Sequence, residues 1–349
     1  MSSRRILITG VSSFWGGRLA QAIERDPSVE AIIGVSTEDP TCEFERTEFV
    51  RLGLQHALLR RIVQAAEIDT VIDTRLVVDS LQAPPRVAHE ANVIGTMNIL
   101  AACGGPHSPV RKVVFKSSAH YYGCEQDDPA FFTEGMRRPH PPRTRLESDV
   151  VEAEKAVEGF ARRNPDVTVT VLRFCNALGP ELRTTHTELF ALPVVPCILG
   201  FDPRYQFIHE EDLVGVLRFA VARDLPGVYN AAGDGVLALS EVASLLGKPL
   251  APILPPWGSS LAAAALRPLG VRVPDEVRNQ LRYGRGLDNR KLKAAGHGYA
   301  FTSRETVLKH AEALRARPLR RGEGEPYRYE REVEEFLRWS PSVRRKGTV

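Results

Sequence analysis

Short runs of β-branched and aliphatic residues alternate with longer segments of helical periodicity along the first two-thirds of the chain. The apolar runs predict six strands, Arg5–Thr9, Ala31–Val35, Glu48–Leu52, Thr70–Thr74, Lys112–Ser117 and Val167–Phe174. The segments between them predict four helices, Gly17–Arg25, His56–Ala66, Pro85–Cys103 and Glu147–Arg163. Strands that alternate with helices are typical of βαβ units. The pattern therefore predicts an α/β fold built on a doubly wound parallel sheet, with its ligand at the carboxyl ends of the strands.

The strand–helix rhythm loosens after about residue 178, where proline and glycine become frequent. We expect a dinucleotide-binding domain at 1–178, with core elements returning at about 205–232, a smaller C-terminal substrate-binding lobe, mainly 179–310, and a charged tail, 311–349. Two further helices are expected, an amphipathic one within Pro255–Leu269 that packs on the core, and an exposed one at Glu325–Trp339.

Composition narrows the class of protein. The 349 residues are 43% hydrophobic and 26% charged, which is typical of a globular protein and excludes a disordered or coiled-coil chain. The net charge of +3 gives no basic excess, so we expect no nucleic-acid partner. Five scattered cysteines without a C-x-x-C pair favour a reduced, cytoplasmic protein with no metal site. The longest apolar run, Leu261–Leu266, is far shorter than the ~20 residues of a membrane span, so no membrane partner is expected.

A glycine-containing turn follows the first predicted strand, Thr9-Gly10-Val11-Ser12-Ser13-Phe14-Trp15-Gly16-Gly17. Backbone N–H groups at such a turn, backed by a helix dipole, suit a pyrophosphate. Turns of this kind often only reverse the chain, but the order strand, turn, helix favours a dinucleotide site of Rossmann type. The candidate cofactor-binding residues here are Gly10, Ser12, Ser13, Phe14, Trp15 and Gly16.

Further motifs follow in a fixed order. They are Asn92-x-x-Gly95-Thr96, Ser117-Ser118-x-x-x-Tyr122-Gly123, Leu172-Arg173-x-x-Asn176-x-x-Gly179-Pro180, Phe207-Ile208-His209-x-x-Asp212, Tyr229-Asn230 and Asp288-x-x-Lys291-Leu292. With them, residues 4–310 resemble the extended short-chain dehydrogenase/reductase family, the NAD(P)-dependent epimerases and dehydratases of nucleotide sugars. The resemblance implies NAD or NADP as cofactor, a small-molecule substrate such as a nucleotide sugar, and a homodimer formed through the helices at 85–103 and 147–163.

The same resemblance assigns roles to individual residues. It places Ser36, Asn92 and Lys155 at the cofactor, and Ser118, Asn176 and Arg204 at the substrate, with Ser118 holding the reacting oxygen. Each has an ordinary structural alternative. A serine at a strand end often satisfies backbone groups, an asparagine shapes a turn, and a lysine or arginine is usually solvated.

Several positions depart from the family pattern. Ser13 replaces the middle glycine of the turn, and Ser36 replaces the acid that holds the ribose hydroxyls. Gly53 stands where the family has an adenine-contacting aspartate. No arginine follows Ser36 to receive a 2′-phosphate, and Glu38 and Asp39 would repel one, so NAD is favoured over NADP.

The catalytic tyrosine of the family is also missing. That tyrosine stands four residues before a lysine, which lowers the tyrosine pKa, and the pair exchanges a proton with the substrate. Here Lys155 is present but Val151 occupies the tyrosine position. His120, two residues after Ser118, is a candidate general acid or base near neutral pH, with a structural histidine as the alternative. The candidate catalytic residues are therefore Ser118, His120 and Lys155.

Three functions stay open on these residues. The first is an epimerase, dehydratase or reductase with an atypical proton donor. The second is a catalytically inactive dinucleotide-binding protein with a sensing or scaffolding role, which the combined loss of the tyrosine, the ribose acid and the adenine-contacting aspartate favours. The third is an enzyme that retains the substrate lobe but no longer binds nicotinamide. The sequence does not identify the substrate, because specificity in this fold lies in loops.

Overall fold

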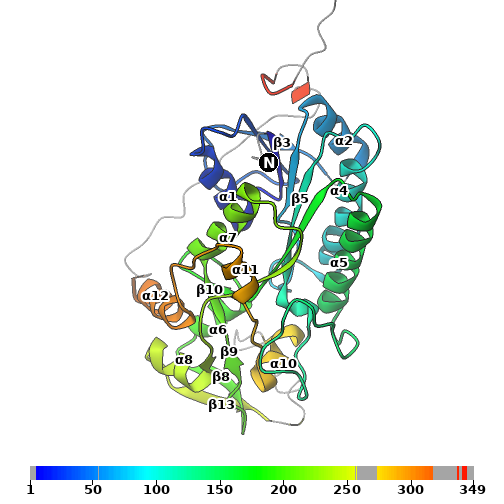
Figure 1. Ribbon diagram of the computed structural model, residues 1–349. Helices are drawn as coiled ribbons and strands as arrows, with labels where there is room; N and C mark the ends of the chain where they lie inside the picture. The colour runs from blue at the N-terminus through cyan, green and yellow to red at the C-terminus, as the bar shows by residue number, and fades with distance from the viewer. Residues whose placement is uncertain are drawn as a thin grey trace, which may run out of the picture.

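The computed structural model describes residues 5–53, 55–255, 257, 273–316, 336–337 and 340–343. Seven parallel strands form its central sheet in the order β3-β2-β1-β4-β5-β6-β11 (Figure 1). Their bounds are β1 Arg5–Thr9, β2 Ala31–Ser36, β3 Thr47–Arg51, β4 Thr70–Asp73, β5 Lys112–Ser118, β6 Thr168–Phe174 and β11 Gly227–Ala231. The strand order reverses between β1 and β4, which is where doubly wound sheets open a ligand crevice. The predicted fold class is confirmed.

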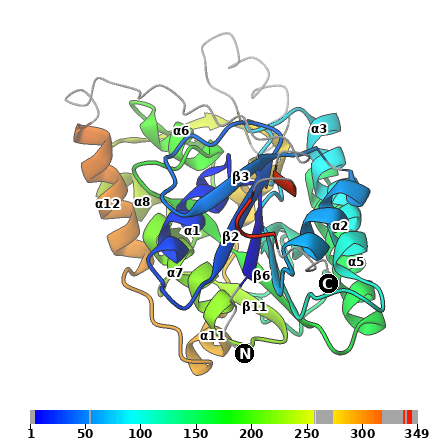
Figure 2. The ribbon, with the colours of Figure 1, turned by 90° about the horizontal axis from the view of Figure 1, so that it is seen from above.

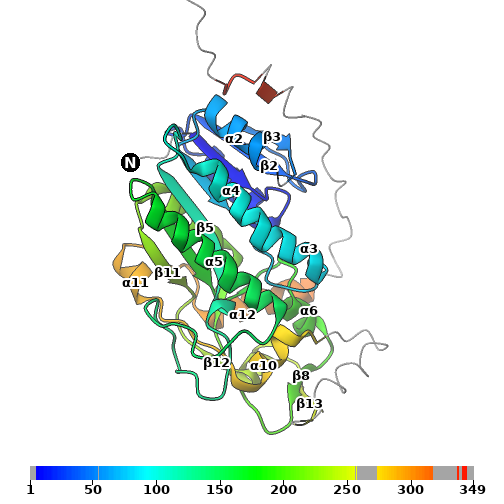
Figure 3. The same ribbon diagram turned by 90° about the vertical axis from the view of Figure 1, so that its right-hand side faces the viewer.

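Helices cover both faces of the sheet (Figures 1 and 2). On one face lie α2 (His56–Ala65), α3 (Pro85–His89), α4 (Thr96–Cys103) and α5 (Arg145–Arg163), which Figure 3 shows from outside. On the other lie α1 (Phe14–Glu24) and α7 (Glu210–Ala222), with the short α11 (Arg290–Ala294) beside β11. Consecutive strand residues enter different cores, since Val71 packs under α2 and Ile72 packs under α1.

The second lobe lies below the sheet in Figure 1. It contains α6 (Thr185–Ala191), α8 (Leu239–Leu246), α10 (Asp275–Tyr283), α12 (Ser303–Ala316) and the strand pairs β8 (Val195–Ile198) with β13 (Leu250–Leu254) and β9 (Arg204–Tyr205) with β12 (Leu237–Ala238). These elements share a third core that includes Phe190, Phe207 and Leu281. A parallel pair, β7 (Asn176–Leu178) and β10 (Phe207–His209), lies between this lobe and the sheet.

The helix predicted at 85–103 is continuous but contains one π-helical turn, η1 (Glu90–Gly95), between α3 and α4. Asn92 lies in this turn and is fully buried. Its side chain accepts from the Val77 N–H at 2.7 Å and donates to the Val77 carbonyl at 2.7 Å. Asn92 therefore holds the segment after β4 in place, and π-turns often occur at such functional positions.

Some element boundaries differ from prediction for identifiable reasons. Helix α1 begins at Phe14 rather than Gly17, because Ser13 caps it by accepting from the Gly16 N–H at 3.3 Å. Helix α12 continues to Ala316, past the expected lobe boundary at 310. Within the predicted exposed helix 325–339, residues 336–337 are described, and Phe336 is fully buried in the core rather than exposed. The amphipathic helix predicted within 255–269 lies outside the described residues except for positions 255 and 257.

Candidate functional site

The glycine turn has the geometry that close packing of strand and helix requires. Gly10 has φ +82°, a conformation that favours glycine. A Cβ on Gly16 would lie 2.4 Å from the Gly10 carbonyl oxygen, so this position admits only glycine. The N–H groups of Phe14 and Trp15, in the first turn of α1, have no partner within the helix. Together with the helix dipole, they fit a diphosphate.

An arginine lies beside the end of β2, on the neighbouring strand β3, and the sequence pattern did not indicate it. The Ser36 hydroxyl lies 2.5 Å from the Ser12 hydroxyl, and Ser36 is aligned with Arg51 on the neighbouring strand β3. The Arg51 guanidinium forms an ion pair with Asp39. No arginine follows Ser36 along the chain, but the pairing of β2 with β3 brings Arg51 beside it. The charge of Arg51 is neutralised by Asp39.

This arrangement makes a testable prediction about cofactor preference. Asp39→Asn leaves the Arg51 guanidinium free to receive a 2′-phosphate, which we expect to raise the affinity for NADPH about tenfold relative to NADH, as a charge-assisted contact warrants. Parallel titrations with the two cofactors measure this ratio. Glu38→Gln, a change at an exposed neighbour that forms no ion pair with Arg51, is the control. An NADPH/NADH ratio that stays at the wild-type value in Asp39→Asn contradicts the prediction.

A second arginine lies at the crevice between β1 and β4. The Arg75 Cγ would be 2.6 Å from a Cβ on Gly10, so its side chain packs directly on the glycine turn. Its Nε donates to Asp73 Oδ1 at 3.1 Å, and the same oxygen accepts from the Thr9 hydroxyl at 2.8 Å. Because this crevice is where a dinucleotide crosses the sheet, Arg75 places a guanidinium, ion-paired with Asp73, beside the expected diphosphate position.

A narrow cavity of about 60 Å³ opens at the carboxyl ends of β5 and β6, next to the start of α1. Its lining comes from both lobes and includes Trp15, Lys116, Ser118, His120, Phe174, Cys175, Asn176, His186, Glu276 and Arg285. Cavities that hold a whole small ligand are usually ~300–1,000 Å³. Side chains such as the Trp15 indole, which packs edge-on against Phe174, must therefore move to admit a substrate.

Ser118 and His120 form a hydrogen-bonded pair in this cavity. The Ser118 Oγ lies 2.9 Å from His120 Nδ1 and also accepts from the His120 N–H at 3.3 Å. Burial, reinforced by the charge of Arg285, holds the pKa of His120 well below its usual value. This favours the neutral imidazole, whose ring contacts the Ser118 hydroxyl, and the role of general acid or base expected from the sequence stays a prediction.

The other candidates divide between the cavity and more distant positions. Asn176 lines the cavity and accepts from the Gln280 side chain at 2.9 Å. Lys155 is exposed on the outer face of α5, in a groove with Met97 and Phe160, so the structure does not support the expected catalytic and cofactor roles. Arg204 is exposed on β9 and is absent from the cavity lining.

Lys116, His186 and Arg285 are among the cavity residues that were not recognised in the sequence. Lys116 and Arg285 are buried cations, and burial lowers the pKa of both. Burial also lowers the pKa of His186 to about 4, so this imidazole is neutral. Lys116 could have been found, because it precedes Ser118 by two residues and alternate strand residues share a face. His186 and Arg285 lie in the second lobe, and no motif in the sequence around them indicates that they line this cavity.

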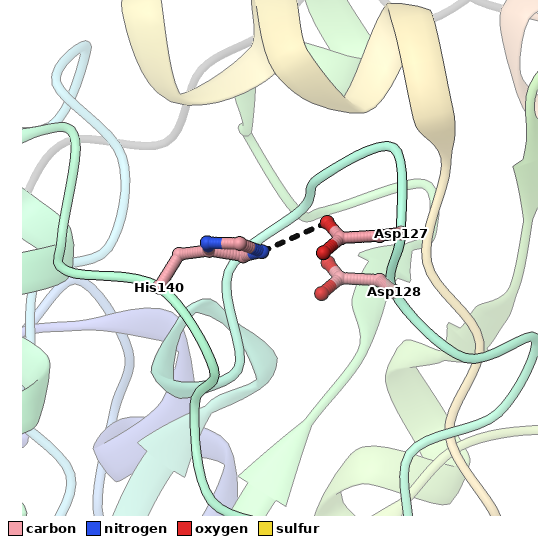
Figure 4. Close-up of side chains that lie close together, drawn as sticks. All are labelled: Asp127, Asp128 and His140. Atoms are coloured by element: carbon pink, nitrogen blue, oxygen red, sulfur yellow. Dashed lines mark hydrogen bonds and ion pairs between the residues drawn. The ribbon is translucent and has the colours of Figure 1, made fainter.

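A cluster away from the cavity bears on the expectation of no metal. The Asp127, Asp128 and His140 ligand atoms lie within 4.8 Å of one another (Figure 4). His140 Nε2 lies 2.8 Å from Asp127 Oδ1, so these two groups already pair with each other. The absence of a metal site stays a prediction. In the described ranges, no helix combines the length and apolar character needed to cross a bilayer.

The sheet, the glycine turn and the adjacent cavity define a dinucleotide-binding protein of the doubly wound class. The sequence profile of the NAD dependent epimerase/dehydratase family matches residues 6–232. An uncharacterized protein of Mycobacterium tuberculosis is 32% identical over 295 residues, which cover 82% of this chain and 78% of that protein. The chain belongs to the NAD dependent epimerase/dehydratase family. The predictions of this family, of an enzyme and of a nicotinamide cofactor are confirmed at the level of the family.

Solved structures share the fold at low identity. UDP-glucuronic acid 4-epimerase from Bacillus cereus, in complex with NAD, superposes with a TM-score of 0.67 at 15% identity, covering 89% of this chain and 96% of that one. dTDP-glucose 4,6-dehydratase from Bacillus anthracis, also with NAD, gives a TM-score of 0.66 at 18% identity, covering 91% of this chain and 100% of that one.

Proposed function

We propose that this protein is an NAD-dependent enzyme that oxidises or reduces a carbinol carbon of a nucleotide sugar, as an epimerase, dehydratase or reductase. The observation that carries the proposal is the cavity beside the glycine turn, where Ser118 and Asn176 offer hydrogen bonds to a substrate oxygen. The structural relatives bound to NAD support the cofactor, and the UDP- and dTDP-sugars in their names support the substrate class.

The residues present fit the cofactor at its diphosphate. The N–H groups of Phe14 and Trp15 lie in the first turn of α1, the Arg75 guanidinium pairs with Asp73 beside the glycine turn, and the Ser36 hydroxyl contacts Ser12 at the end of β2. NAD supplies the hydride acceptor when bound. Ser118 holds the substrate oxygen, and His120 orients the Ser118 hydroxyl. The Trp15 and Phe174 rings give part of the cavity lining an apolar surface.

Turnover of UDP- and dTDP-sugars tests this proposal. We expect Ser118→Ala to lower kcat about a hundredfold, since removal of one positioned donor commonly costs ~10²-fold. His120→Ala is expected to cause a smaller decrease, because it only orients that donor. The exposed His107 provides a matched control, His107→Ala, with wild-type kcat. Unchanged kcat in both cavity variants would remove the proposed roles.

One observation favours a second function, a dinucleotide-binding protein without turnover that senses or scaffolds. None of the cavity-lining residues comes from α5, the helix on which the family pattern places its tyrosine and lysine. Val151 and Lys155 are half-buried and exposed, respectively, on that helix. Saturable NADH binding without turnover of any sugar nucleotide is the result expected for this alternative.

Association into a homodimer is proposed through the helices at 85–103 and 147–163. Val87, Ile94 and Met97 are 53%, 47% and 55% exposed on the first of them, and apolar side chains gathered on one surface favour association. We expect Met97→Asp to shift a dimer to monomers in light scattering at micromolar concentration. Leu199→Asp, at an apolar residue of similar exposure in the other lobe, leaves the dimer intact. A monomeric wild-type protein contradicts the proposal.

The cytoplasm is the compartment we propose for this activity. All five cysteines are free. Burial raises the pKa of Cys42 to about 11 and of Cys175 to about 12, so neither is a reactive thiolate at neutral pH. Inert, unpaired thiols suit a reducing compartment.

A further inference from the structure

Lys116 is a buried lysine on β5 that faces the cavity. Its exposure is 3%, and it lines the cavity together with Ser118. Alternate residues of a strand point to the same face and lie ~7 Å apart along it. A substrate hydroxyl between the two side chains is therefore within reach of both.

The Lys116 amine has one hydrogen-bond acceptor and one aromatic ring as its immediate contacts. Its Nζ donates to the Leu76 carbonyl at 2.6 Å and lies 4.4 Å from the centre of the Trp15 ring. Within the described ranges no carboxylate forms an ion pair with it. Lys112, on the same strand, differs, since its Nζ lies 2.8 Å from Asp224 Oδ1. A buried ammonium without a carboxylate is costly, so the neutral amine of Lys116 is accessible.

We propose that Lys116 exchanges the proton with the substrate hydroxyl in this cavity, the task that a tyrosine performs in the family pattern. This inference rests on the proposed function and names its proton carrier. In the oxidising direction, the neutral Lys116 amine takes the O–H proton and becomes an ammonium. The C–H bond of the substrate breaks with its electron pair as the C=O bond forms, and bound NAD⁺ would supply the acceptor for that hydride. In the reducing direction, the ammonium returns the proton to the oxygen.

The electrostatic surroundings suit a proton carrier at neutral pH. Burial lowers the pKa of Lys116 to about 7, while the negative charge of Asp73 opposes this shift. The other titratable or charged groups around the cavity are Asp79, His120, Cys175, His186, Glu276 and Arg285. The two imidazoles are neutral, and the Asp79 carboxylate is held by the N–H and hydroxyl of Thr185. Both protonation states of Lys116 are therefore populated near pH 7, where proton transfer is most effective.

Chemical labelling tests the amine without any turnover. Trace acetic anhydride acetylates neutral amines, and the reagent itself has no protonation equilibrium between pH 5 and 10, so its rate with each lysine, relative to an added reference amine, follows the deprotonation of that lysine. Peptide mapping by mass spectrometry, between pH 5 and 10, should show a Lys116 rate that rises to half its plateau near pH 7. Ordinary lysines, with pKa values of ~10.4, should keep gaining reactivity up to pH 10. A Lys116 rate that also rises to pH 10, or no labelling of Lys116 at any pH, overturns the proposal.

Variants test the role in the reaction. We expect Lys116→Met to lose at least a hundredfold in kcat on a sugar nucleotide that the wild type converts, with NADH binding unchanged. Lys116→Arg should not restore kcat, because a guanidinium keeps its proton at pH 7. Ethylamine should rescue Lys116→Ala but not Ser118→Ala. The buried Lys112 supplies the control, since Lys112→Met removes a lysine of the same strand that does not line the cavity.

The dependence of the wild-type kcat on pH tests in which direction Lys116 transfers the proton. The kcat of alcohol oxidation should rise with pH through about 7, and that of carbonyl reduction should fall. If Lys116→Met keeps the full kcat, or if the pH profile of kcat is unchanged in Lys116→Arg, another group exchanges the proton with the substrate hydroxyl. If the wild-type protein converts no sugar nucleotide but Lys116 still labels with a midpoint near pH 7, the proposed substrate class is contradicted. The low pKa of the Lys116 amine is then still supported.

Discussion

Arg173→Met is expected to lower the free energy of unfolding by about 3–5 kcal/mol, because it leaves a buried carboxylate without its partner. The Arg173 Nε lies 3.0 Å from Glu154 Oε1, and its second nitrogen lies 2.6 Å from Glu154 Oε2. The two side chains are only 4% and 6% exposed. Ser117 donates to the same carboxylate at 2.5 Å, and the Arg173 guanidinium stacks 3.5 Å from the Tyr121 ring centre. The pair therefore ties α5 to β5 and β6 beneath the cavity.

Urea unfolding measures this effect, and a double variant is its control. Arg173→Met combined with Glu154→Leu removes both charges, so we expect it to recover most of the loss. The exposed pair Arg162–Glu158, on the same helix, gives a matched comparison, since Arg162→Met should cost less than about 1 kcal/mol. An Arg173→Met variant as stable as the wild type would show that this ion pair does not stabilise the fold.

Gly16→Ala is expected to abolish detectable NADH binding. The added Cβ would lie 2.4 Å from the Gly10 carbonyl oxygen and 2.8 Å from the Thr74 hydroxyl. Neither group is a flexible side-chain end that can swing away, so the start of α1 must move away from β1. That movement displaces the N–H groups of Phe14 and Trp15, and overpacking of this kind also costs about 1–3 kcal/mol of stability.

Calorimetric titration with NADH measures the loss, and Gly298→Ala is the control. Gly298 has open space where its Cβ would be placed, so the substitution should leave binding unchanged. Circular dichroism separates loss of binding from loss of the fold. Wild-type affinity in a folded Gly16→Ala variant would show that the dinucleotide does not use this turn.

The sequence predicted the sheet well because its strands are short apolar runs with few alternatives. Parallel strands such as Lys112–Ser118 are buried on both faces, and such runs are unambiguous when helical segments separate them. The glycine turn was equally predictable, since the positive φ at Gly10 and the lack of space for a Cβ at Gly16 both require glycine.

The candidate site was harder to predict because distant segments build it. Arg51 comes beside Ser36 through strand pairing, and Arg285 reaches the cavity from beyond α10. Lys155 was chosen by spacing from a motif, but its angular position on α5 turns it to solvent. Which face a helix residue occupies depends on how the whole helix packs, and a four-residue spacing does not determine this.

The central claim is that this protein binds a nicotinamide dinucleotide at its glycine turn. Titration of the wild-type protein with NADH, followed by tryptophan fluorescence, tests it most directly. Trp15 stands both in the glycine turn and in the cavity lining, so bound NADH must change its environment. We expect a saturable quench with one NADH per chain. Because the chain has three tryptophans, Trp15→Phe should reduce this quench, while calorimetry still shows binding. The absence of binding by both methods, at millimolar NADH and NADPH, would contradict the account.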